Sequence, residues 1–442
     1  MNTTRKVAVD ILDAILDKGA YSNIALNSSL NKSELEDRDK ALVTEIVYGT
    51  LKYKYTIDKI LASFLKQDLK KMDSFIVNIL RTAIYQILFL DKIPEFAAVN
   101  EAVDMAKKHK SVSTSKLVNG VLRNYLRNKS KIYYNENDRI ESLCFKYSYE
   151  PWLVKLFIEQ YGEDKAEQIL IGLNSIPAVT IRVNSLKISV DEAFERLKTM
   201  EYDVEEGLVC PEAIRIIRGR SIEQNPLFRE GLATVQDESA MLVAPSMDII
   251  TNITVLDICS APGGKTTHIS ELMNNTGKIH AYDIHKDKLS LIEQNSKRLG
   301  ITNIKCGVLD AAVYNGELKD TAERVLIDVP CSGLGIIRKK PEIKWTKNLK
   351  QLKKIIKIQR DIMSSAAKYV KIGGVLLYST CTLNKKENEN NVKWFLSNFT
   401  NYNIEESFYG ELDNIIYDKY GVTILPNEYM DGFFIAKFKR IR

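Results

Sequence analysis

The feature that most constrains the fold is the stretch 255–272, which reads VLDICSAPGGKTTHISEL. Apolar β-forming residues and an acid lead into a Pro-Gly-Gly turn at 262–264, and Ile269 and Leu272 follow at helical spacing. This pattern predicts a strand, a tight loop and a helix. Because such a loop presents bare backbone N–H groups beside a helix N-terminus, it suits a carboxylate or phosphate and favours a nucleotide-type cofactor site.

The glycine spacing narrows the choice of nucleotide. A P-loop requires a glycine five residues before Gly264, but position 259 is Cys. A dinucleotide fingerprint requires three glycines as G-x-G-x-x-G, whereas Gly263 and Gly264 are adjacent here. Asp283 closes an apolar run about 20 residues further on, where an acid binds a ribose hydroxyl in such folds. A ribose-bearing ligand without a pyrophosphate fits best, and S-adenosylmethionine is the favoured candidate.

Residues 236–442 alternate strand and helix patterns, which predicts a doubly wound α/β domain of the Rossmann-like type. The strands are expected at 254–257, 278–283, 304–309, 324–328, 374–379 and 433–438, and the helices notably at 349–370 and 385–397. Acids end or follow four successive strands: Asp257, Asp283, Asp310 and Asp328. Each alone could be a cap or a turn former. Ligands bind outside the carboxyl ends of the strands in this fold, so the repeated position favours a site.

Two cysteines stand at strand ends. Cys331 follows the fourth strand in Pro-Cys-Ser, and Cys381 ends the fifth in Thr-Cys-Thr. Neighbouring strands lie about 5 Å apart, so both thiols are expected in one crevice. A thiolate that adds to C6 of cytosine makes C5 nucleophilic, and the residues alone do not rank the two thiols for that role. The remaining cysteines are expected to be small buried residues: Cys144, Cys210, Cys306 and, provisionally, Cys259.

Three motifs in order, DICSAPGGK at 257–265, DVPCSG at 328–333 and STCT at 379–382, resemble those of the RNA cytosine-C5 methyltransferases. The chain is most similar to the RsmB/Sun/Fmu group, which modifies a cytosine of small-subunit ribosomal RNA, and the similarity covers essentially the whole chain. It implies S-adenosylmethionine as cofactor and cytosine 967 of 16S ribosomal RNA as target. It also implies that a loop binds the methionine part, formed by Cys259, Ser260, Ala261, Pro262, Gly263, Gly264 and Lys265.

The same resemblance assigns the remaining site residues. Asp283 would bind the ribose and Asp310 the adenine edge. Cys381 would be the nucleophile, and Cys331 would assist release of the finished base. Asp328 is expected near the methyl group, where its protonated form could bond the cytosine edge.

The region before the catalytic domain is expected to hold two further domains. Residues 1–140 show helical periodicity, with helices near 6–17, 38–65 (with a possible break at Gly49), 73–90, 97–109 and 115–127. This bundle resembles the RNA-binding NusB fold, in part through the stretch LVNGVLRNYL. Residues 128–150 are polar and are expected to form a linker. Residues 141–235 are expected to form a small α+β module, with helices at 151–160, 164–173 and 190–200 and strands at 178–183 and 213–217.

Two segments are candidates for RNA contact. Arg182 and Asn184 match a family element that lies toward the RNA, although a pairing of Arg182 with a local acid is an equally good interpretation. Arg338, Lys339 and Lys340 follow the Cys331 loop and could hold phosphates, or could form a solvated turn.

Composition sets the outer limits. The formal charge of +6 permits a polyanionic partner without requiring one. Six cysteines without a C-x-x-C pair or zinc-ligand spacing favour reduced thiols, no metal and a cytoplasmic protein. No apolar run is long enough to span a membrane, and a monomer is expected. Two alternatives stay open: a tRNA cytosine-C5 methyltransferase, and a catalytically idle RNA-binding assembly factor, which the presence of both Cys331 and Cys381 disfavours.

Overall fold

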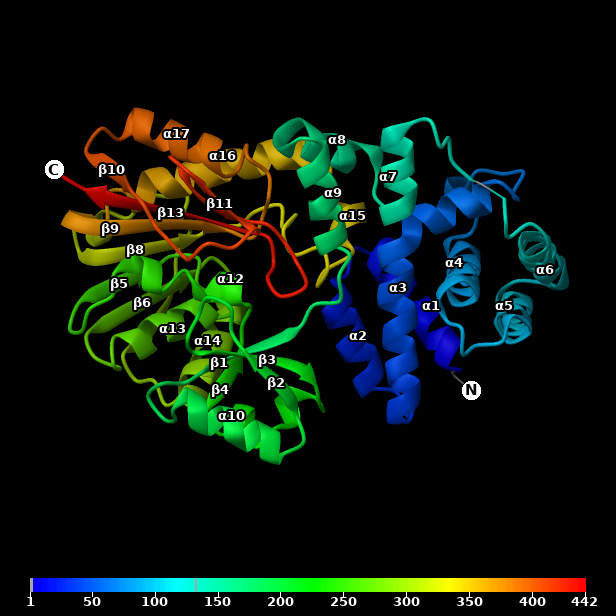
Figure 1. The fold of residues 1–442 in the computed structure, drawn as a ribbon, viewed down its shortest axis with the longest axis horizontal. Coiled ribbons are helices and arrows are strands. Elements are labelled where there is room, and N and C mark those ends of the chain that lie inside the picture. The colour runs from blue at the N-terminus through cyan, green and yellow to red at the C-terminus, as the bar shows by residue number, and fades with distance from the viewer. Residues whose placement is uncertain (1–2, 132) are drawn as a thin grey trace. The chain divides into compact units, whose positions relative to one another are not determined.

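The computed structural model describes residues 3–131 and 133–442 (Figure 1), and the chain divides into two compact units. The helical unit comprises the chain up to Asn174 together with Ile337–Lys347. The sheet unit comprises Ser175–Ile336 and Asn348–Arg442. The first boundary falls later than the expected end of the bundle at residue 140, because three further helices pack with the N-terminal ones.

The helical unit is built from amphipathic helices around two apolar clusters. Its helices are α1 Thr4–Leu16, α2 Ser22–Asn31, α3 Asp37–Ala62, α4 Ser74–Phe89, α5 Glu95–His109, α6 Val112–Arg127, α7 Arg139–Tyr147, α8 Pro151–Tyr161, α9 Glu163–Gly172 and the short α15 Ile343–Thr346. Helix α7 lies within the expected linker, so that expectation is wrong for 139–147. The polar stretch still buries Leu143 and Cys144 on one helix face.

The expected break at Gly49 is also wrong, because α3 continues through it. A Cβ atom at this position would lie 1.9 Å from the ring of Tyr85. The glycine therefore lets α4 approach α3 closely and does not interrupt the helix.

The segment Ile337–Lys347 lies between β8 and α16 in the chain but packs inside the helical unit. The ammonium of Lys344 is fully buried and donates to the carbonyl oxygens of Lys52 (3.0 Å) and Ser148 (3.1 Å) and to Oδ1 of Asn174 (2.9 Å). Burial and the charge of Lys52 lower the pKa of Lys344 well below its ordinary value. This lysine anchors the segment through backbone oxygens that need a donor.

The sheet unit contains two sheets. The smaller has the antiparallel order β2-β3-β1-β4, with α10 Val190–Thr199 and α11 Pro226–Arg229 beside it. Its strands are β1 Val179–Val183, β2 Asp203–Glu206, β3 Ala213–Arg218 and β4 Ala233–Val235. The expected α+β module is present, with β2 and β4 added to the two predicted strands, but its predicted helices at 151–160 and 164–173 are α8 and α9 and belong to the helical unit.

The larger sheet has the order β11-β12-β13-β9-β8-β5-β6-β7, and β10 pairs with β13. The parallel part consists of β5 Thr254–Asp257, β6 Lys278–Asp283, β7 Ile304–Val308, β8 Ala322–Asp328 and β9 Val370–Thr380. An antiparallel edge follows, formed by β10 Tyr402–Glu405, β11 Ile415–Asp418, β12 Gly421–Ile424 and β13 Phe433–Arg440. The predicted Rossmann-like core is confirmed, and three short strands of this edge were not predicted.

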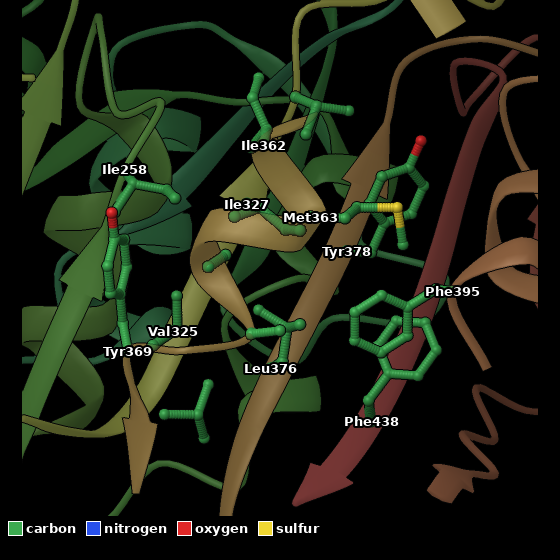
Figure 2. Packing of buried hydrophobic residues seen from close by; sticks show 14 of the residues in the cluster. Ile258, Val325, Ile327, Ile362, Met363, Tyr369, Leu376, Tyr378, Phe395 and Phe438 are labelled. Atoms are coloured by element: carbon green, nitrogen blue, oxygen red, sulfur yellow. The ribbon is translucent and has the colours of Figure 1, made fainter. Parts of the chain in front are cut away.

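Helices cover both faces of this sheet. One face packs against α16 Leu349–Ala366 and α17 Glu389–Asn398, and Figure 2 shows Ile362, Met363 and Phe395 against Val325 and Leu376. The other face packs against α12 Glu238–Met241, α13 Gly264–Leu272 and α14 Lys286–Leu299. Successive residues of a strand point to opposite faces, so the central strands are apolar on both sides and their polar residues gather at the ends.

We expect Lys344→Ala to destabilise the helical unit by about 3 kcal/mol, because it leaves buried oxygens, including those of Lys52, Ser148 and Asn174, without their donor. Urea unfolding followed by circular dichroism measures the change. Lys66→Ala is the matched control, since Lys66 is exposed and its removal should change the stability by less than about 0.5 kcal/mol. Equal stability of the two variants would contradict the anchoring role of Lys344.

Candidate active site

The loop between β5 and α13 forms one wall of the site. Gly263, with φ of +99°, caps α13 in a left-handed conformation that favours glycine. A Cβ atom on Gly264 would meet no atom within 4 Å, so open space borders the loop there. The backbone N–H and Oγ of Ser260 both donate to the carbonyl of Tyr282, at 2.9 Å each. These bonds fix the loop against the end of β6.

A cavity of about 300 Å³ lies at the carboxyl ends of the parallel strands. Its lining contains the predicted Asp283, Asp310 and Asp328 and, from the loop, Cys259 and Ala261. The other predicted loop residues are not among the lining residues: Ser260, Pro262, Gly263, Gly264 and Lys265. The prediction missed further lining residues, namely Ile258, Ile284, His285, Lys288, Leu309, Ala311, Ala312, Pro330, Ile358 and Ile362. Of these, Ile284 and His285 directly follow Asp283, and Lys288 lies a few residues further on. Their closeness to Asp283 in the sequence could have predicted them.

The acids at the strand ends also order the loops around the cavity. Asp283 accepts from the backbone N–H of Ala261 (3.3 Å) and of His285 (2.9 Å). Asp310 accepts from the N–H of Ala312 at 3.0 Å. The mixture of carboxylates and apolar side chains fits S-adenosylmethionine, which combines hydroxyl and amino donors with a flat purine.

The two thiols meet, as the sequence predicted. Strands β8 and β9 run parallel with Asp328 paired to Ser379, and the Sγ atoms of Cys331 and Cys381 lie 3.2 Å apart. Both residues are half-buried. The two sulfur atoms therefore lie in contact at one edge of the sheet, where both can take part in one reaction.

A half-buried charge pair, Lys265 and Asp328, lies beside the thiols. Nζ of Lys265 donates to Oδ2 of Asp328 at 2.6 Å, and Oγ of Ser379 donates to Oδ1 at 2.8 Å. Burial lowers the pKa of Lys265, but the Asp328 carboxylate outweighs burial and raises it overall. Each carboxylate oxygen of Asp328 therefore accepts one hydrogen bond.

The thiols differ in their surroundings. The pKa of Cys331 is raised well above its ordinary value by its hydrogen bond with Cys381 and by its burial. Burial likewise raises the pKa of Cys259 well above its ordinary value. Both groups therefore favour the neutral thiol. The expectation of small buried residues is confirmed for Cys144 and Cys210, whereas Cys259, in the cavity wall, and Cys306 are half-buried.

Asp257 ends β5 below the loop and is 1 % exposed. Its Oδ2 accepts from the hydroxyl of Thr266 at 2.7 Å, whereas Oδ1 has no hydrogen-bond partner among the described residues. Burial raises the pKa of this carboxyl to about 7. The carboxyl group of Asp257, behind the cofactor loop, therefore changes its charge near neutral pH.

The expected RNA contacts of Arg182 and Asn184 are wrong, because both side chains are buried and engaged. Arg182 is 0 % exposed and donates to both carboxylate oxygens of Glu271, at 3.0 and 2.8 Å, and to the carbonyl of Gly264 at 2.8 Å. Asn184 donates to the carbonyls of Gly231 and Leu299 at 2.9 Å each. These side chains join the small sheet to the cofactor-binding domain, and the acid partner of Arg182 is the one alternative that holds.

Arg338 is likewise buried, at 8 % exposed, so a phosphate contact does not fit its position. Lys339 and Lys340 are half-buried. Among residues 3–131 and 133–442, no group of three or more His, Cys, Asp or Glu could hold a metal ion. Within the same residues, no helix has the length and apolar character needed to cross a membrane.

Fold and site together define a Rossmann-like S-adenosylmethionine-dependent methyltransferase with two cysteines at its active centre. Three family models match the chain: the 16S rRNA methyltransferase RsmB/F at 244–439, the NusB family at 2–127 and the ferredoxin-like domain of RsmF/B-like methyltransferases at 149–223. The chain belongs to the RsmB/F family of ribosomal RNA methyltransferases.

Relatives match over the full length. The probable ribosomal RNA small subunit methyltransferase B of Bacillus subtilis (strain 168) is 35% identical over 443 residues, which cover 99% of each chain. That of Synechocystis sp. is 34% identical over all of both chains. The crystal structure of PH0851 superposes with a TM-score of 0.84 at 28% identity, again over 99% of each chain.

We expect the stability of the Asp257→Asn variant to change less with pH than that of the native protein. In the folded state Asp257 holds its proton to about pH 7, whereas the unfolded chain releases it near pH 4. This stabilising contribution is complete below about pH 4 and is lost as pH rises through about 7, by up to about 4 kcal/mol. Urea unfolding at pH 4 to 8 measures it. Asp287→Asn, which removes an exposed acid, should follow the native profile.

Arg182→Ala should destabilise the sheet unit by about 3–5 kcal/mol, because it leaves Glu271 buried without its partner. The salt dependence of binding to a 16S rRNA transcript should stay unchanged, because Arg182 does not reach the surface. Loss of a phosphate contact would instead reduce the slope of log affinity against log salt by about one. Such a reduction, without loss of stability, would restore the RNA role.

Proposed function

We propose that this methyltransferase modifies C5 of cytosine 967 in 16S ribosomal RNA through a covalent adduct between Cys381 and C6 of the base. The observation that carries the proposal is the 3.2 Å contact between the Cys381 and Cys331 sulfur atoms beside the Lys265–Asp328 pair. The C5 atom of cytosine does not accept a methyl group unaided. A thiol that adds to C6 makes C5 nucleophilic enough to accept it.

The surroundings of the two thiols support unequal roles. Cys331 retains its proton. The ammonium of Lys265 is held by Asp328, and the Cys381 sulfur also contributes to raising the Lys265 pKa, after the opposing effect of burial and the larger effect of Asp328. We therefore assign proton donation to Cys331, and we assign Cys381 as the nucleophile, as the resemblance to RNA enzymes with both cysteine motifs implies.

The proposed reaction uses Cys381, Cys331 and a base that takes up the C5 proton. The Cys381 thiolate forms a bond to C6, and the electron pair of the C5–C6 double bond becomes available at C5. The loop and Asp283 would hold S-adenosylmethionine, which would supply the methyl group for C5 and leave as S-adenosylhomocysteine. The proton of C5 then leaves to a base, the double bond reforms and the S–C6 bond breaks. The S–H of Cys331 can hydrogen-bond the departing Cys381 sulfur, which lowers the cost of its negative charge.

Lys339 and Lys340, on the segment that follows the Cys331 loop, are half-buried and remain the candidates for phosphate contacts. A ribosomal RNA substrate supports a cytoplasmic location. The proposed acting species is the monomer.

The target is tested by bisulfite sequencing of 16S ribosomal RNA from cells with and without the gene. We expect one 5-methylcytosine signal, at cytosine 967, to disappear without the gene and to return with the native gene but not with a Cys381→Ala copy. A ribosomal map that stays the same, with a changed tRNA map, would replace the proposed substrate. Identical maps for both RNA classes would favour the idle assembly factor.

The two thiols are tested separately with a 16S transcript in vitro. Cys381→Ser should reduce methyl transfer to background and form no covalent RNA adduct, because the nucleophile is lost. Cys331→Ser should form the adduct but release it slowly, so an RNA-linked protein band should accumulate in a denaturing gel. The reverse pattern would exchange the assignments of Cys331 and Cys381.

A further inference from the structure

The segment 384–391, directly after the Cys381 loop, is unusually polar for a buried part of the molecule. Asn384, Glu387, Asn388 and Asn391 are each 1 % exposed or less. Buried polar groups cost stability unless every one is hydrogen-bonded, and a buried carboxylate costs most. None of these side chains belongs to the cofactor cavity or to the thiol pair, so their burial needs another explanation.

The carboxylate of Glu387 accepts four hydrogen bonds. Oε2 accepts from the backbone N–H of Ser332 (2.9 Å) and from Nε2 of Gln359 (3.0 Å). Oε1 accepts from the hydroxyl of Ser332 (2.6 Å) and from Nδ2 of Asn384 (3.0 Å). Each oxygen therefore faces two donors, and the geometry requires a group that accepts at both oxygens and donates at neither.

These bonds enclose Cys331 on both sides. Ser332 follows Cys331 and binds Glu387 through its backbone and its side chain. Pro330 precedes Cys331, and its carbonyl accepts from the same Nε2 of Gln359 at 3.0 Å. The residues before and after the thiol are thus fixed to one carboxylate, directly or through Gln359.

Asn388, which follows Glu387, holds the loop around Cys381 in the same way. Oδ1 of Asn388 accepts from the hydroxyl of Thr380 (2.7 Å), and its Nδ2 donates to the carbonyl of Thr382 (2.9 Å). Thr380 and Thr382 stand on either side of Cys381. The hydroxyls of Ser332 and Thr382 lie 2.7 Å apart and join the two loops.

We propose that Glu387 is a positioning residue that keeps the Cys331 sulfur against the Cys381 sulfur, with Asn388 fixing the Cys381 side. The role of the pair in catalysis rests on the proposed function, but the alignment of the thiols does not. Removing the carboxylate frees the backbone on both sides of Cys331, and a thiol displaced by an ångström loses much of its reactivity toward its partner.

Glu387→Gln is the sharp test, because glutamine has nearly the same shape. In either orientation its NH₂ group replaces an oxygen that now accepts two hydrogen bonds, so a donor meets donors. Glu389→Gln is the matched control. It removes a carboxylate two residues away, one that makes no hydrogen bond to the Cys331 or Cys381 loops among the described residues.

Thiol alignment is measured without RNA or cofactor. Diamide oxidises two adjacent thiols to a disulfide and is itself reduced to the hydrazide, taking up both protons and both electrons. Peptide mapping by mass spectrometry follows the Cys331–Cys381 bond. We expect Glu387→Gln to slow its formation by about tenfold or more, and Glu389→Gln to match the native rate. An unchanged rate in Glu387→Gln would overturn the proposal.

Turnover gives the second measurement. We expect kcat for the 16S transcript to fall by about 10²-fold in Glu387→Gln with the KM for S-adenosylmethionine unchanged, because the cofactor cavity does not contain Glu387. A general loss of structure would change both constants. If Glu387→Gln does not fold, Ser332→Ala removes one of the four hydrogen bonds to the carboxylate, together with the hydroxyl contact to Thr382, and should give a smaller slowing in the same direction. If the native protein methylates no RNA, the diamide result still decides the positioning role.

Discussion

The parallel pairing of β8 with β9 is the interaction on which the active centre depends. Parallel neighbours end at the same edge of a sheet, so the loops that follow them emerge side by side even though fifty residues separate Cys331 from Cys381. The register that pairs Asp328 with Ser379 also produces the hydrogen bond between their side chains. A slip of one residue would turn one strand's side chains to the opposite face.

Around this edge the sheet unit concentrates charge that a protein interior normally excludes. The pairs Lys265–Asp328 and Arg182–Glu271 and the carboxylate of Glu387 are each compensated by hydrogen bonds or by an opposite charge. Such groups cost stability but need no reorganisation when charge develops in a reaction. Asp257 differs, because one of its oxygens has no partner among the described residues. Its carboxyl accordingly favours the neutral form.

The sequence was most informative where local pattern and tertiary role agree. The bounds of β5 and β6 match the prediction, because each is an apolar run closed by an acid. The expectation failed where partners are distant in sequence. In the sequence Arg182 resembles a surface cation, but its side chain pairs with Glu271. The side chain of Asn184 donates to the carbonyl of Leu299. The short strands β10 to β12 are held by pairing with β13 and one another. Their own composition gives little signal.

The unequal behaviour of the two thiols follows from where charges lie. Glu387 and Asp328 both place negative charge toward Cys331, after the larger effects of Cys381 and of burial, and all four favour its protonated form. Lys265 supplies the positive charge that interacts with Cys381. The carboxylate that fixes the backbone around Cys331 therefore also disfavours its ionisation. Two chemically identical side chains in contact therefore lie in different electrostatic surroundings, which the strands and loops around them set.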